Sequence, residues 1–359
     1  MNRHDKKASR LAMLIAACCI IAGCTPSSGN GNTANNNNSI NYTSTLRVYN
    51  ASEYIDESTL RDFEKEYSIK VEYDEFESNE EMYETIKHNP NAYDILVPSD
   101  YMVDRLIKEG ALAKLDKSLI PNISHVAEDY ISPAYDAGND YTVPYMVGTL
   151  GVLYNKKQVA EPVESWSAIF DPNYSSKALM LDSERDAIGA ALKMLGFSMN
   201  SSDDSELSQA KASLLASAHI FAFLESEDIR DRLVAGESYI GVVYSGDAKT
   251  AIDRNPNLAY SIPAEGANKW VDGFVILNSS PHIDEAHKFI NYMCKPSIAV
   301  RNMAHIGYTS PIKGAWSEFG GNKIMFPSTE ELERCEAFIY DEHATQKYHS
   351  IWQDIRGYW

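Results

Sequence analysis

Strand-like and helix-like segments alternate along this chain from about residue 45 onward, and this alternation constrains the fold more than any other feature. Short apolar runs predict strands at residues 46–50, 69–73, 94–99, 148–155, 177–181, 239–244, 258–263 and 269–277. Amphipathic or capped segments predict helices beginning near Ser58, Ser78, Tyr101, Ser183, Ser245 and Asp284, and residues 329–359 are also expected to be helical. Such alternation defines the α/β class, and residues 45–359 suffice for two lobes.

Several of the predicted strands end in short polar segments. These segments lie at residues 50–54, 99–101, 182–186 and 244–247, and all contain Ser, Tyr or Asp. Ligands of open α/β sheets bind beside the carboxyl ends of strands. The pattern therefore predicts a binding site to which several of these strand ends contribute.

Trp270 and Asp272 stand two residues apart at the start of the apolar run 269–277. Side chains of a strand alternate between its faces, so we expect this pair to share one face. One interpretation is a plain strand boundary, with a solvated carboxylate beside a packing indole. The other is a ligand-binding pair, and the two residues alone leave both open.

The N-terminus has the pattern of an export signal. A basic segment precedes the apolar stretch 11–23, which is too short for a membrane-spanning helix and is typical of a signal peptide over residues 1–23. The stretch ends in Ile-Ala-Gly-Cys24, which resembles the bacterial lipobox, and a simple secretory peptide is the alternative. Residues 24–44, rich in Asn, Gly and Ser, predict a flexible tether behind a lipidated Cys24.

The chain is acidic, with a formal net charge of −19. This charge argues against nucleic acid as a partner, because phosphate binding needs a basic face. It suits a cationic ligand, although it also serves solubility. Of the five cysteines, Cys294 and Cys335 belong to the folded part, and we expect both to be free.

Motifs of catalysis are absent from the sequence, which contains no G-x-S-x-G, H-E-x-x-H, phosphate-binding loop or G-x-G-x-x-G. His282 and His287 miss the spacing of paired metal ligands on one helix face. We therefore expect no metal, no cofactor and no enzymatic activity.

Eight segments, taken in order, resemble the spermidine/putrescine-binding proteins of ABC importers: VYNASEYIDE, FESNEEMYETIK, AYDILVPSDYMVDRLIKEGAL, NDYTVPYMVGTLGVLYN, LDSERDAIGAALKMLGFS, VVYSGDA, KWVDGFVILN and IGYTSP. The resemblance implies a two-lobed periplasmic-binding-protein fold of type II, with hinge-connected lobes of mixed sheets and flanking helices. Residues 45–148 with 271–312 would form the first lobe, and residues 149–270 with 313–359 the second.

The resemblance also implies a site that closes on a polyamine, a row of ammonium groups separated by methylenes. Carboxylates would bind the nitrogens, and aromatic faces would contact the chain between them. The matching positions are Ser52, Tyr54, Ser99, Tyr101, Asp186, Tyr244, Asp247, Trp270, Asp272 and Tyr308. Each has a structural alternative, such as a turn serine, a helix cap or simple packing.

Three positions depart from the family pattern. Ala51 stands where an aromatic residue is usual, Ser183 where an acidic one is, and Phe338 where a glutamine is. These departures leave open which polyamine is bound, and also whether the ligand is another cationic or amino-acid-like molecule. A secreted enzyme acting on glycans with two carboxylates is a more distant alternative.

The expected partners follow from the same resemblance. They are a polyamine, putrescine or spermidine, and the permease and ATPase subunits of an ABC transporter. We expect a monomer held at the extracytoplasmic side of the membrane, periplasmic or at the cell surface, by the lipid on Cys24.

Overall fold

The computed structural model describes residues 40–159 and 162–358. The predicted signal peptide, Cys24 and most of the tether lie outside the described residues. Within them, no helix is both long and apolar enough to span a bilayer.

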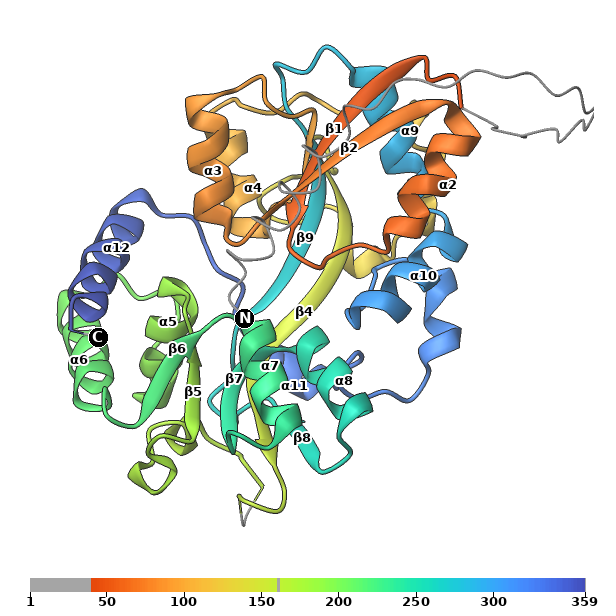
Figure 1. The fold of residues 1–359 in the computed structure, drawn as a ribbon. Coiled ribbons are helices and arrows are strands. Elements are labelled where there is room, and N and C mark those ends of the chain that lie inside the picture. Colours follow the sequence, from red (N-terminus) through yellow and green to blue (C-terminus); the bar gives the residue numbers. More distant parts are fainter. Residues whose placement is uncertain (1–39, 160–161, 359) are drawn as a thin grey trace, which may run out of the picture. The chain divides into compact units, whose positions relative to one another are not determined.

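A mixed sheet organises the described part of the chain (Figure 1). Its strands are β1 Ser44–Ala51, β2 Ile69–Phe76, β3 Ile95–Leu96, β4 Thr142–Asn155, β5 Ala178–Leu181, β6 Phe221–Leu224, β7 Ile240–Tyr244, β8 Leu258–Ser261 and β9 Lys269–Ile276. Their order is β2-β1-β3-β9-β4-β7-β5-β6, and β8 pairs with β4. The pairs β1–β2, β1–β3, β5–β6 and β5–β7 are parallel, and those made by β4 and β9 are antiparallel.

Strands β4 and β9 join the two ends of this sheet. β9 pairs with β3 on one side and with β4 on the other, with Gly148 of β4 opposite Trp270. The remainder of β4 pairs with β7 and β8. The two strands run side by side through the middle of the fold, and β9 carries Trp270 and Asp272 there (Figure 1).

Helices flank the sheet, which confirms the predicted α/β class. They are α2 Glu57–Tyr67, α3 Asn79–His88, α4 Asp100–Lys108, α5 Glu184–Met194, α6 Asp204–Ala216, α7 Ser226–Ala235, α8 Ser245–Arg254, α9 Ile283–Met293, α10 Pro296–Ile306, α11 Thr329–Glu333 and α12 Glu342–Arg356. A side chain caps the start of α2, α3, α5, α6, α11 and α12. The Ser78 hydroxyl accepts a bond from Glu81 N at 3.1 Å, and the Ser183 hydroxyl caps α5 in the same way.

The predicted helix over residues 329–359 is wrong in its middle. α11 and α12 are separate, and Glu336 between them lies extended beside the start of β9. Lys269 N donates to Glu336 O at 3.0 Å, and Glu336 N donates to Ala267 O at 2.9 Å. Tertiary pairing therefore overrides the local helical pattern.

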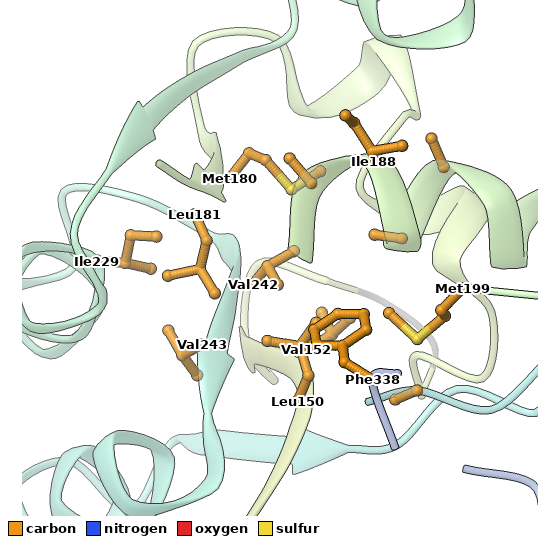
Figure 2. Close-up of a cluster of buried hydrophobic side chains, with 14 of the residues drawn as sticks. Leu150, Val152, Met180, Leu181, Ile188, Met199, Ile229, Val242, Val243 and Phe338 are labelled. Carbon is orange, nitrogen blue, oxygen red and sulfur yellow. The ribbon is translucent and has the colours of Figure 1, made fainter. Parts of the chain in front are cut away.

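Apolar side chains form two buried clusters. One surrounds β5, β7 and the second half of β4, and Figure 2 shows Val152, Val242 and Phe338 packed within it. The other lies against β1, β3 and β9 and includes Leu46, Ile95 and Phe274. Cys294 and Cys335 are both free and buried, as expected.

Candidate functional site

The start of β9 presents Trp270 and Asp272 on one face, as the strand alternation predicted. Trp270 Nε1 donates a hydrogen bond to Asp272 Oδ2 at 3.1 Å. The Tyr54 hydroxyl donates to the same oxygen at 2.6 Å, although it lies far away in the sequence. Asp272 is thus not a solvated strand boundary, because its exposed fraction is 7%.

A glycine on the neighbouring strand makes room for the indole. A Cβ at Gly148 would lie 2.4 Å from the Trp270 ring, closer than side-chain atoms can approach. The pairing of β4 with β9 therefore positions Trp270 only because residue 148 has no side chain.

Burial raises the pKa of Asp272 to about 6, and the polar groups of Tyr54, Ser99 and Trp270 near the carboxyl partly oppose this rise. Asp272 Oδ1 is buried and has no hydrogen-bond partner among the residues that the structure describes. A carboxylate in this state favours a cation, because a positive charge would compensate the desolvated negative one.

Four aromatic rings contact one another edge to face, and two of them, Tyr54 and Trp270, hydrogen-bond Asp272. The ring centroids are 5.2 Å apart for Tyr54 and Tyr308, 6.2 Å for Trp270 and Tyr308, and 5.1 Å for Tyr244 and Trp270. Tyr308 contacts the start of α8, where a Cβ at Gly246 would lie 2.2 Å from its ring. The rings offer apolar area and ring faces, which suit methylenes and cations.

Asp186, at the start of α5, forms a second carboxylate centre. Its Oδ2 accepts hydrogen bonds from the Tyr244 hydroxyl at 2.8 Å and the Ser183 hydroxyl at 2.7 Å. Its Oδ1 is buried without a partner among the described residues, and burial raises its pKa. Asp186 is therefore the third residue of a capped helix and also a buried carboxylate beside the aromatic set.

Asp247, in the first turn of α8, has a different environment. Arg230 Nη1 donates to its Oδ1 at 2.9 Å. Its Oδ2 accepts from the Ser226 hydroxyl at 2.8 Å and from the Tyr308 hydroxyl at 3.4 Å. Both oxygens are used within the chain, and the charge is paired.

The three other predicted residues lie differently around this centre. Ser99 pairs with Asp272 in an isolated antiparallel bridge, and Asn79 Nδ2 donates to its hydroxyl at 3.1 Å. Tyr101 is buried, and its hydroxyl donates to Glu80 Oε1 at 2.8 Å. Ser52 N donates a backbone hydrogen bond to Phe76 O at 3.1 Å.

The positions that depart from the family pattern are part of the packing. Ala51 is half-buried and contacts both apolar clusters. Phe338 packs into the cluster of Figure 2, and its ring contacts Tyr101 edge to face at 6.2 Å. The Arg185 guanidinium lies 4.6 Å from the Tyr101 ring centroid and 5.4 Å from that of Phe338.

Sequence reasoning missed three charged residues near these groups. Asp100 is 4% exposed, and burial, followed by the charge of Asp272 among the raising causes, raises its pKa to about 7. Glu80 accepts a hydrogen bond from the Tyr101 hydroxyl, and Arg230 forms an ion pair with Asp247. The polar segment at 99–101 signalled Asp100, whereas no sequence motif singled out Glu80 or Arg230.

No group of three or more His, Cys, Asp or Glu side chains arranged to hold a metal ion occurs in residues 40–159 and 162–358. The arrangement instead has the features of a binding site for an organic cation: buried carboxylates, aromatic rings and hydroxyl donors.

The chain belongs to the family of bacterial extracellular solute-binding proteins, whose model matches residues 59–319. Among its relatives is the spermidine/putrescine-binding periplasmic protein of Escherichia coli (strain K12), 32% identical over 314 residues that cover 84% of this chain and 90% of the relative. A second relative is a putrescine-binding periplasmic protein of Pseudomonas aeruginosa (strain UCBPP-PA14), 34% identical over 321 residues that cover 84% of this chain and 85% of the relative.

Solved structures agree with this assignment and confirm the binding-protein fold. A structure from Listeria monocytogenes described as a spermidine/putrescine ABC transporter has a TM-score of 0.85 and 33% identity, covering 88% of this chain and 99% of that one. A lipoprotein of Treponema pallidum has a TM-score of 0.78 and 26% identity, covering 87% and 99%.

Proposed function

We propose that this protein captures a polyamine outside the cytoplasm and delivers it to the membrane subunits of an ABC transporter. The observation that carries the proposal is the pair Asp272 and Asp186, each buried with one carboxylate oxygen that no described residue engages. The relatives named above are described as spermidine/putrescine-binding, and the same chemistry would serve a polyamine here.

The contacts of the two carboxylates indicate how each would bind one end of a polyamine. An ammonium beside Asp272 Oδ1 would pair with the carboxylate and lie among the rings of Tyr54, Trp270 and Tyr308. A second ammonium would pair with Asp186 Oδ1, and the methylenes between would contact Tyr244. Each cation–π contact contributes ~0.5–2 kcal/mol.

The direct test is isothermal calorimetry of the purified protein with putrescine, cadaverine, spermidine and spermine. We expect saturable binding of at least one of them, with one ligand per chain. Absence of heat from all four, at protein concentrations where the fold is intact by circular dichroism, would refute the proposal.

Two further parts of the proposal concern the whole chain. The chain would bind with two lobes, residues 45–148 with 271–312 and residues 149–270 with 313–359, that close on the ligand. The mature protein would be held at the membrane by a lipid on Cys24. The lipobox pattern supports the anchor, and one structural relative is itself a lipoprotein.

A further inference from the structure

Arg230 of α7 lies beside the aromatic set, and its side chain is only 15% exposed. Its Nη1 is 2.9 Å from Asp247 Oδ1 and 3.4 Å from Glu53 Oε2, and its Nε is 3.2 Å from Asp231 Oδ1. One guanidinium thus interacts with three carboxylates, one from α8, one from the loop after β1 and one from α7 itself.

These pairs make Asp247 unlike the other two buried carboxylates. Asp272 and Asp186 each keep one buried oxygen without a partner in the described chain, whereas both oxygens of Asp247 accept hydrogen bonds from side chains. A ligand ammonium arriving at Asp247 would have to displace Arg230 or approach a fixed positive charge. Like charges brought together in this way are a common means of rejecting a ligand.

We propose that Arg230 sets the number of ammonium groups that the site accepts. Its guanidinium takes the place of a third ligand ammonium at Asp247, so that Asp272 and Asp186 select a diamine over a triamine. This inference rests on the proposed function, because it assumes that polyamines are the ligands.

The surroundings of Arg230 show what its removal would leave. Glu227, one turn earlier on α7, has a pKa raised to about 7 by burial and then by the charge of Asp247. Glu53 faces the same guanidinium. Without Arg230, these acidic groups and Asp247 would form an acidic cluster that attracts an ammonium group.

Arg254 provides a matched control for the loss of a positive charge. It lies at the end of α8, and its Nη1 is 2.6 Å from Asp231 Oδ1. Its partner is therefore Asp231, whereas Arg230 also holds Asp247. Arg254→Gln removes the same charge nearby and leaves the Arg230–Asp247 pair in place.

The experiment measures putrescine and spermidine affinities by calorimetry for the wild type, Arg230→Gln, Arg254→Gln and the double variant Arg230→Gln, Asp247→Asn. We expect the wild type to prefer putrescine, and Arg230→Gln to raise spermidine affinity by about tenfold or more relative to putrescine. Arg254→Gln should keep the wild-type ratio, and the double variant should lose the gain. Arg230→Met, which keeps the apolar stem, replaces Arg230→Gln if that variant does not fold.

Two results would overturn the inference while leaving polyamine capture intact. One is a wild type that binds spermidine at least as tightly as putrescine. The other is a folded Arg230 variant whose spermidine-to-putrescine ratio equals that of the wild type. A wild type that binds neither ligand, nor cadaverine or spermine, would instead refute the proposed function, and the inference would fall with it.

Discussion

Asp272 combines deep burial with incomplete hydrogen bonding, a combination that disfavours the unliganded state. Its Oδ2 is held by Tyr54 and Trp270, and its Oδ1 has no partner in the described chain. A desolvated carboxylate gains from a bound cation what it lost by leaving water. Asp272 would therefore weaken the empty protein and strengthen a complex with a bound cation.

The substitution Asp272→Asn tests the role of the charge without changing the size of the side chain. The variant removes the charge while an amide keeps similar hydrogen-bonding geometry, so a ligand ammonium would be buried without its counterion. We expect affinity for the best wild-type polyamine to fall by ~2–5 kcal/mol, roughly thirtyfold to several thousandfold. Calorimetry measures the loss, and Trp270→Leu should lose less, about 0.5–2 kcal/mol for the cation–π contact plus some packing.

The stability of the empty Asp272→Asn variant is its control. In the folded protein the pKa of Asp272 is raised from 3.8 to about 6. The carboxyl therefore adds to the free energy of unfolding at pH values below its pKa in the unfolded chain, and this contribution is lost as the pH rises through 6. The variant should therefore melt at a higher temperature than the empty wild type at pH 8. A folded variant that binds as tightly as wild type would refute the role assigned to Asp272.

The pH dependence of binding follows from the same groups. A bound ammonium stabilises the Asp272 carboxylate, so binding below pH 6 must release its proton. The pKa of Asp100 is raised to about 7 and that of Asp272 to about 6, so we expect affinity to be steady above pH 8 and to fall as pH decreases from 7 to 5. Titrations at half-unit steps measure this, and Asp272→Asn should flatten the lower part of the curve. An equally steep curve in that variant would assign the effect to other groups.

Among the elements, the pairing of β4 with β9 places the indole. Gly148→Ala would put a Cβ 2.4 Å from the Trp270 ring, so the ring must move. Overpacking of this kind costs about 1–3 kcal/mol of stability, and we expect a polyamine affinity at least about tenfold weaker. Thermal melting and calorimetry measure the two effects.

Gly320→Ala is the matched control, because the nearest atom to a Cβ there, Ser317 O, is 3.9 Å away. It should change neither melting temperature nor affinity. Unchanged binding in Gly148→Ala would mean that the position of Trp270 is not critical for the ligand.

Elements with strong local signals could be predicted from the sequence. The apolar runs gave β7, β9 and the second half of β4, and the spacing behind Ser78 gave the start of α3. The alternation of β9 placed Trp270 and Asp272 together. The break between α11 and α12 could not be predicted, because Glu336 is held there by backbone bonds to Ala267 and Lys269 across the fold.

For the candidate site, the sequence indicated the types of residue but not the hydrogen bonds and ion pairs between them. The types of residue at strand ends gave carboxylates and aromatic rings, and the contacts bring most of them together. The pair Arg230–Asp247 joins two helices, and the pair Tyr101–Glu80 also joins two. Such pairs depend on how the helices are placed in the tertiary structure, which no local sequence pattern indicates.

At the scale of the whole molecule, the proposed lipid anchor on Cys24 would decide whether the binding protein is tethered to the membrane or diffuses freely. We expect Cys24→Ser to move the protein from the membrane fraction to the soluble extracytoplasmic fraction, because the proposed lipid on Cys24 would be what holds it. Immunoblots of fractionated cells measure this, and unchanged polyamine affinity of the released protein shows that it is folded. Persistent membrane association of the variant would contradict lipidation at Cys24.

The place of β9 in the sheet also bears on when this chain can fold. β9 ends at Ile276 and lies between β3 and β4, which are made much earlier in synthesis. Until β9 arrives, the edges of β3 and β4 that face it lack their partner, and the backbone groups there stay in water. A nascent chain that ends before β9 therefore has an incomplete sheet, and the central pairings of the fold form only once residues 269–276 have been made.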